Sequence, residues 1–181
     1  MEKLRKDFFE RKAEIIAREL LGKVLVRKLL EEKEEKLMKA RIVETEAYYD
    51  ENDPASRACK NGDLKKTMES KAGTILVYGV HNNWLINFVT GKEGKAEAVL
   101  IRAIEPLNFQ ANTRGPGLLT KALRIGKEFH KKNICSCEEL WLEDNKVRDL
   151  EIQEAKRIGV REDLDEPLRF YIKGNKWVSK K

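Results

Sequence analysis

The sequence predicts an α+β fold, a single domain in which a curved and mostly antiparallel β-sheet carries helices packed at its edges. The 181 residues fit one domain with one hydrophobic core, so we expect residues 1–181 to form one unit. Strand-like segments follow one another through most of the chain, whereas helical patterns occur only at its start and late in it. The strand–helix alternation of a doubly wound parallel sheet is missing.

Two helices are expected. The first covers residues 7–21, because Asp7 and Glu10 have the spacing of a capping box and Gly22 can end the helix. The second covers residues 115–130, where a proline lies near the first turn and an apolar periodicity follows.

A hairpin and a long loop follow the first helix. Two apolar segments, residues 24–30 and 37–49, flank the charged run 31–36, which is typical of two strands joined by a turn. We expect the charged run to be a solvated tip rather than a contact surface. Residues 50–72 are polar and poorly periodic, which predicts a long loop with at most one helical turn. Loops of this length inside compact domains are usually functional or mobile.

The remaining strands are predicted from short runs of apolar and β-branched residues that end in turns or polar segments. They are residues 73–79, 83–89, 96–107, 140–144, 157–160 and 167–172.

Composition narrows the class of protein. The net charge of +6 suits a polyanionic partner such as nucleic acid. No stretch approaches the about 18 apolar residues that span a bilayer, and the first residues lack a signal-peptide pattern, so we expect a soluble cytoplasmic protein without a membrane partner. The cysteines Cys59, Cys135 and Cys137 are odd in number and lack a C-x-x-C pair, which argues against a disulfide framework or a zinc finger.

The segment of residues 41–48 carries the most chemical information. On a strand, alternate side chains share a face, so Glu44, Glu46 and Tyr48 are expected to point the same way. The pattern alone leaves three readings open: a solvent face, a general base beside a stacking platform, or a pair of metal ligands. The metal reading is short of partners, because the two histidines, His81 and His130, lie in no metal-ligand motif. We therefore expect neither a metal nor a cofactor.

Seven blocks of the sequence, taken in order, resemble the alkyladenine (3-methyladenine) DNA glycosylase family. They are RIVETEAY, GTILVYG, NWLINFVTG, VLIRAIEPL, RGPGLLTKAL, LWLED and PLRFYIKGNKWVS. The resemblance covers the chain from roughly residue 8 to its last residues. It implies a base-excision-repair enzyme that flips a damaged purine, alkylated or deaminated, out of duplex DNA and hydrolyses its N-glycosidic bond. It also implies a monomer that works on double-stranded DNA in the nucleoid.

The resemblance assigns roles to five residues. Glu46, the second glutamate of E-T-E-A-Y, would stabilise oxocarbenium character on the sugar and activate water. Arg102 would lie beside the catalytic site, in contact with the phosphate backbone and the water network. Tyr48 and Tyr78 would stack on the flipped base, and electron-rich rings favour cationic purines. Asn87 would lie on the pocket floor and discriminate against the amino group of guanine.

The chain departs from the family pattern at two places. Arg57 stands where the family usually has a histidine, and a guanidinium facing a cationic base would be repulsive. Either Arg57 points away or neutral lesions gain importance. The family's wedge segment is one residue shorter here and lacks its second tyrosine, so Val80 or His81 would fill the hole left by the flipped base.

Two other functions remain open from the sequence. A non-catalytic nucleic-acid-binding domain of the same architecture would bind DNA without releasing a base. A metal-dependent phosphoesterase would use Glu44 and Glu46 as ligands. No lysine occupies the position of Glu46, so a Schiff-base lyase step has no support. The sequence leaves the lesion open among 3-methyladenine, 7-methylguanine, hypoxanthine and ethenoadenine.

Overall fold

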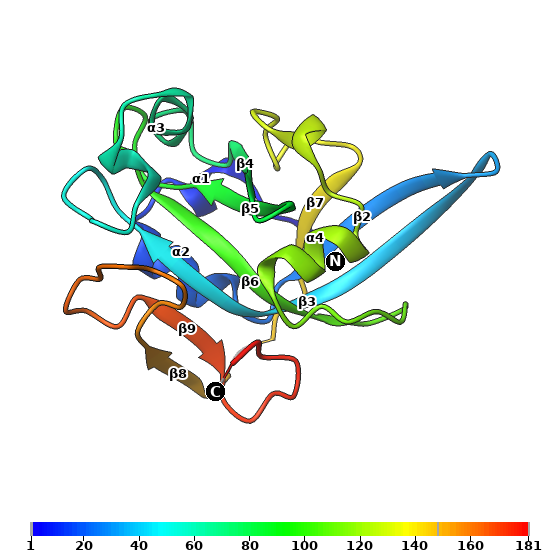
Figure 1. Cartoon of the computed structure of the whole chain (residues 1–181). Helices are drawn as coiled ribbons and strands as arrows, with labels where there is room; N and C mark the ends of the chain where they lie inside the picture. Colours follow the sequence, from blue (N-terminus) through cyan, green and yellow to red (C-terminus); the bar gives the residue numbers. More distant parts are fainter. Residues whose placement is uncertain (1, 148, 181) are drawn as a thin grey trace.

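An open sheet of nine strands forms the body of the protein in a computed structural model that describes residues 2–147 and 149–180. The strand order is β1-β7-β2-β3-β6-β5-β4, and β9 pairs with both β3 and β8 (Figure 1). Every pairing among the described strands is antiparallel. The predicted α+β class, with a mostly antiparallel sheet in a single domain, is confirmed.

The strands are β1 (Glu2–Lys3), β2 (Val24–Glu31), β3 (Glu34–Tyr48), β4 (Ile75–Val80), β5 (Asn83–Val89), β6 (Ala98–Pro106), β7 (Leu140–Asp144), β8 (Ile152–Ala155) and β9 (Arg169–Ile172). The helices are α1 (Lys6–Phe9), α2 (Ala13–Leu20), α3 (Asp63–Met68) and α4 (Pro116–Ala122), and short 3₁₀ helices span Arg57–Cys59 and Lys127–Phe129.

The two faces of β3 have different environments. Thr45 and Ala47 face the main core, where the Thr45 hydroxyl donates a 2.7 Å hydrogen bond to the Ala17 carbonyl of α2. The alternate residues therefore point to the opposite face of the sheet. That face carries a second, smaller apolar cluster beneath the loop of residues 50–72, against which Tyr48 and Tyr78 pack. The site described below lies on this second face.

The expected first helix over residues 7–21 is wrong in its continuity, because the chain breaks it into α1 and α2. The capping box at Asp7 does not form: residue Arg5 precedes α1, and no side chain caps it. At α2, the buried carboxylate of Glu97 accepts a 2.9 Å hydrogen bond from the Ala13 N–H instead. A carboxylate distant in sequence thus accepts a hydrogen bond from the first backbone N–H of α2. Gly22 follows α2 with a φ of +84°, as expected of the residue that ends it.

The second helix is also shorter than expected. It ends at Ala122 as α4, because Arg124 adopts a φ of +50°, and only a 3₁₀ turn follows at Lys127–Phe129.

The strand expected at residues 157–160 is wrong, since these residues form a loop in which Gly159 has a φ of +75°. The strand in this region is β8, which the sequence pattern did not reveal.

The β2–β3 hairpin projects from the body of the molecule (Figure 1). Its turn is Glu32–Lys33, both with positive φ, and the charged run around it is exposed apart from the half-buried Glu31. The charged run is therefore a solvated tip, as expected, although the strands extend further into it than the sequence indicated. The loop of residues 50–72 contains a 3₁₀ turn and the short α3. None of the described helices is long and apolar enough to cross a membrane.

Candidate active site

Strand register brings the predicted site residues to one face of the sheet. Glu46 of β3 pairs with Leu100 of β6, and Leu100 pairs with Asn87 of β5. Directly paired residues of antiparallel strands share a face. Tyr48 and Arg102 lie two positions along their strands and point the same way. Residues far apart in the sequence are thus neighbours because of the sheet alone.

The Glu46 carboxylate is fully buried and held by three donors. Its Oε1 accepts a 2.8 Å hydrogen bond from the Ile158 backbone N–H, and its Oε2 accepts one of 2.8 Å from the Tyr48 hydroxyl. The Arg102 Nη1 lies 3.3 Å from both oxygens. Burial raises the pKa of Glu46 above its usual value, although the Arg102 charge and the Ile158 N–H lower it. A carboxylate with a raised pKa is a stronger base than a solvent-exposed glutamate.

Glu44 points the same way but has a different environment. Its oxygens accept from the Arg169 guanidinium at 2.9 Å and from the Ser179 N–H at 2.7 Å. The Arg102 Nε lies 3.5 Å from Glu44, so one guanidinium bridges both glutamates. Arg102 thereby occupies the place between the carboxylates that a shared cation would need. Across the described parts of the chain, no three His, Cys, Asp or Glu residues gather as a metal site.

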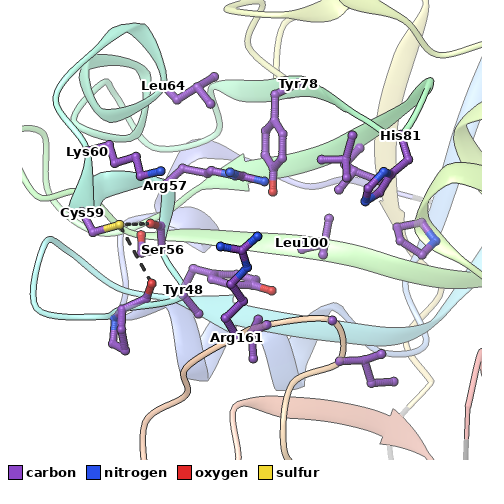
Figure 2. Close-up of a pocket in the computed structure, with 18 of the residues that line it drawn as sticks. Tyr48, Ser56, Arg57, Cys59, Lys60, Leu64, Tyr78, His81, Leu100 and Arg161 are labelled. Atoms are coloured by element: carbon purple, nitrogen blue, oxygen red, sulfur yellow. Dashed lines mark hydrogen bonds between the residues drawn. The ribbon is translucent and has the colours of Figure 1, made fainter.

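A cavity of about 880 Å³ opens in front of this cluster. Figure 2 shows Tyr78 and Tyr48 on opposite walls, with Leu100 of the sheet between them. Of the residues predicted for the site, Tyr48, Tyr78, Arg102, Val80 and His81 line the cavity. The other two, Glu46 and Asn87, do not line it and lie within the sheet behind it.

Glu46 is the first of these, because Tyr48 and Arg102 cover it on the cavity side through the contacts given above. Burial, and then the Glu46 charge, raise the pKa of Tyr48 well above its usual value. Tyr48 therefore remains a phenol at neutral pH and keeps donating to Glu46.

Asn87 is the second. It is only 2% exposed, and its Nδ2 donates a 3.2 Å hydrogen bond to the Leu76 carbonyl. Burial raises the pKa of Tyr78, and hydrogen bonds from Arg57 and Asn87 oppose that rise. The Asn87 amide thus supports the Tyr78 wall from behind.

Val80 and His81 lie at the rim of the cavity, at the tip of the β4–β5 hairpin. His81 and Asn82 form its two-residue turn with φ values of +47° and +61°. His81 is exposed and Val80 is half-buried. Both candidate wedge residues are therefore at the protruding edge of the site.

The loop of residues 50–72 closes one wall of the cavity, and two of the contacts that fasten it are made to side chains distant in sequence. The His130 ring accepts a 3.2 Å hydrogen bond from the Val77 N–H through Nδ1, so its Nε2 carries the proton and donates to Asp63 at 3.0 Å. Asp63 also pairs with Lys131. His130 is thus a structural link between β4 and the loop.

Arg157 fastens the other end of the loop, and sequence reasoning missed it. Its guanidinium is buried, binds Asp53 through two hydrogen bonds of 2.6 and 2.7 Å, and also contacts Asp163. It lies 4.6 Å from the centroid of the Tyr48 ring. Nothing in a single sequence pairs residue 53 with residue 157, and the surrounding R-I-G-V pattern suggested a strand.

Arg57 does not point away from the site. Its guanidinium carbon lies 4.8 Å from the centroid of the Tyr78 ring, inside the cavity lining (Figure 2). The alternative in which Arg57 points away is therefore wrong, and its charge stays at the pocket.

Comparison with known proteins places this chain in a family. The sequence profile of the family described as "Methylpurine-DNA glycosylase (MPG)" matches residues 7–176. A protein of Legionella pneumophila (strain Paris) is 44% identical, over 99% of this chain and 100% of its own. One of Aeropyrum pernix is 40% identical, over 98% and 93%, and one of Clostridium tetani is 38% identical, over 99% and 100%. Each is named "Putative 3-methyladenine DNA glycosylase".

The family match and these relatives identify the protein as a DNA glycosylase, a hydrolase of the N-glycosyl bond that serves DNA repair. More particularly, the chain belongs to the methylpurine-DNA glycosylase family, and the resemblance seen in its sequence blocks is confirmed.

Proposed function

We propose that the protein flips a damaged purine out of double-stranded DNA into the cavity between Tyr48 and Tyr78 and hydrolyses its glycosidic bond. The observation that carries the proposal is the buried Glu46 carboxylate, with its raised pKa, immediately behind Tyr48 and Arg102. A base inside a duplex is out of reach of any side chain, so extrusion must precede chemistry.

The chemistry assigned to Glu46 follows from its charge and position. As the bond between C1′ and the base nitrogen breaks, its electron pair leaves with the base and positive charge develops on the sugar. The carboxylate stabilises that charge and takes a proton from the water that attacks C1′. The abasic sugar gains the hydroxyl of the water. A cationic base leaves as a neutral molecule, whereas a neutral base leaves as an anion and takes up a proton. No amine occupies this position, so the step ends without strand cleavage.

We assign Arg102 to this step and not to contact with the phosphate backbone. Its guanidinium contacts Glu44, Glu46 and the Ile158 carbonyl, the last at 3.4 Å. A side chain held by two buried carboxylates orients Glu46 and the water beside it. We therefore expect phosphate to be contacted by cationic side chains that have no carboxylate partner.

The pocket residues recognise the base. Tyr48 and Tyr78 offer ring faces for stacking. The Asn87 amide does not line the cavity, so we assign it the support of the Tyr78 wall and not a direct contact with the guanine amino group. The substrate class is a damaged purine, alkylated or deaminated, which agrees with the 3-methyladenine in the names of the relatives.

The basic surface supports duplex DNA as the partner. Lys60 and Arg161 line the cavity and form no ion pair within the described part of the chain. Such cations can neutralise phosphates on either side of the flipped nucleotide. Val80 or His81 would enter the vacated step in the duplex. We infer a monomer that acts inside the cell, on the DNA of the nucleoid.

Base-release chromatography on duplexes that each carry one modified purine tests the proposal. We expect free damaged base and an intact abasic strand, with rates unchanged by excess EDTA at neutral pH. Tight binding without any base release would support the non-catalytic DNA-binding domain instead. Activity lost in EDTA and restored by Mg²⁺ or Zn²⁺ would support the metal-dependent phosphoesterase.

A further inference from the structure

Both tyrosines of the cavity already have a guanidinium against their ring. Arg57 lies 4.8 Å from the Tyr78 centroid, and Arg157 lies 4.6 Å from the Tyr48 centroid. A cation over an aromatic ring uses the attraction that the ring would otherwise offer to another cation. The rings are therefore less suited to a positively charged base than two bare tyrosines would be.

The charge of the cavity lining also disfavours a positively charged base. Four cationic side chains line it, Arg57, Lys60, Arg102 and Arg161, and of these only Arg102 has a carboxylate partner in the described residues. The one carboxylate of the lining, Asp63, is already bound to His130 and Lys131. The space that receives the base is thus net positive, with Arg57 set on its aromatic wall.

Damaged purines differ in charge in a way that this site can sense. A purine alkylated at N3 or N7 carries a positive charge while it is attached to deoxyribose. A deaminated purine such as hypoxanthine is neutral and presents O6 and N7, which are both acceptors. A guanidinium only donates hydrogen bonds. It therefore attracts the acceptor edge of a neutral purine and repels a cationic one.

We propose that Arg57 is a specificity-determining residue that favours neutral, acceptor-bearing purines over cationic alkylated purines. This inference rests on the proposed function, because it assumes that the base enters the Tyr48–Tyr78 cavity. Arg57 also assists the release of the neutral base, which is the poorer leaving group of the two. A neutral base leaves with a developing negative charge, which a nearby guanidinium stabilises, whereas a cationic base leaves as a neutral molecule and gains nothing from it.

The test is a ratio of single-turnover rates of base release, 7-methylguanine divided by hypoxanthine, each in the same duplex context. Comparing this ratio between variants cancels the intrinsic difference between the two leaving groups. We expect Arg57→Gln to raise the ratio about tenfold, because one charge near the base is removed. Arg57→Lys keeps the charge and should stay close to wild type.

Lys71→Gln is the matched control. It removes one positive charge from an exposed residue of the same loop that does not line the cavity, and its ratio should equal that of wild type. Binding to an abasic-site duplex verifies that each variant is folded.

Three results have distinct meanings. A ratio unchanged in Arg57→Gln overturns the inference while the glycosylase function stands. An equal rise in Lys71→Gln also overturns it, since the selectivity would then come from overall charge rather than from Arg57. Absence of release of both bases by the wild-type protein would overturn the proposed function itself.

Discussion

The Ile158 backbone N–H donates a 2.8 Å hydrogen bond to the Glu46 Oε1, across 112 positions of the chain. The preceding residue, Arg157, is locked by its buried pair with Asp53 and donates to the Ala47 carbonyl at 3.0 Å. The loop that carries Ile158 is therefore part of the site, and its position depends on an ion pair outside the cavity.

Replacement of Arg157 by methionine should destabilise the protein. Asp53 would be left buried without its partner, and loss of one member of a buried pair costs about 3–5 kcal/mol. The free energy of unfolding in urea measures this cost. Base release should fall as well, because the Ile158 N–H is no longer fixed against Glu46.

Arg161→Met is the matched control, since Arg161 is an exposed arginine of the same loop. Its free energy of unfolding should change by no more than about 0.5 kcal/mol. Adding Asp53→Asn to Arg157→Met should recover part of the lost stability, as expected for coupled residues. An Arg157→Met variant as stable as wild type would contradict the role given to this pair.

The rate of base release should fall toward acid with a midpoint above pH 4.5, the usual pKa of a glutamic acid. Burial raises the pKa of Glu46, so the fraction present as carboxylate decreases as the pH falls through that raised value. Single-turnover rates between pH 4.5 and 8 give the profile. A rate independent of pH over this range would argue against Glu46 as the base.

The raised pKa of Glu46 affects the free energy of unfolding in the opposite direction, since here it is a rise in pH that is unfavourable. The folded state holds the Glu46 proton more tightly than the unfolded state, so this group's stabilising contribution is complete below the unfolded pKa. It is lost as the pH rises through the folded pKa. Glu46→Gln should therefore remove this component from the pH dependence of unfolding.

The hairpin tip should matter most on well-paired lesions. We expect His81→Ala to lose more activity than Val80→Ala, because His81 is the exposed turn residue and its ring can fill an unstacked step. The loss should shrink when the lesion lies opposite a mismatch or in single strand, since extrusion then costs less. Equal losses on all substrates, or none in either variant, would remove the wedge role.

Phosphate contacts should be visible in the salt dependence of duplex binding. Lys60→Gln should reduce the slope of log affinity against log salt by about one unit, for one phosphate no longer neutralised. Arg161→Gln should behave alike. Slopes equal to wild type would place both residues away from the backbone of the DNA.

The sequence predicted most of the sheet because alternating apolar residues and turn residues are local signals. The strands of residues 83–89 and 140–144 have the bounds that the pattern indicated. Helix limits were less accurate, because contacts with distant residues decide them. The Ala13 N–H bonded to Glu97 is one case, and a left-handed residue inside the expected second helix, Arg124, is another.

The shared face of Glu44, Glu46 and Tyr48 was predictable from strand alternation, and the structure brings Arg102 to the same cluster. The supports of that cluster were not predictable. Arg157, Asp53 and the Ile158 N–H lie in irregular loops, where no periodicity reveals which segments meet. The placement of Arg57 on the Tyr78 ring likewise depends on the fold of the long loop.

The most direct test of the mechanism compares Glu46→Gln with wild type in two assays on the same protein preparation. Glutamine keeps the size of the side chain and an oxygen for the Ile158 N–H, but it cannot take a proton from water. We predict that single-turnover release of a damaged base is abolished, while affinity for an abasic-site duplex remains near that of wild type, since the carboxylate acts on the transition state more than on the bound state. Base release by Glu46→Gln at a rate near that of wild type would contradict the account.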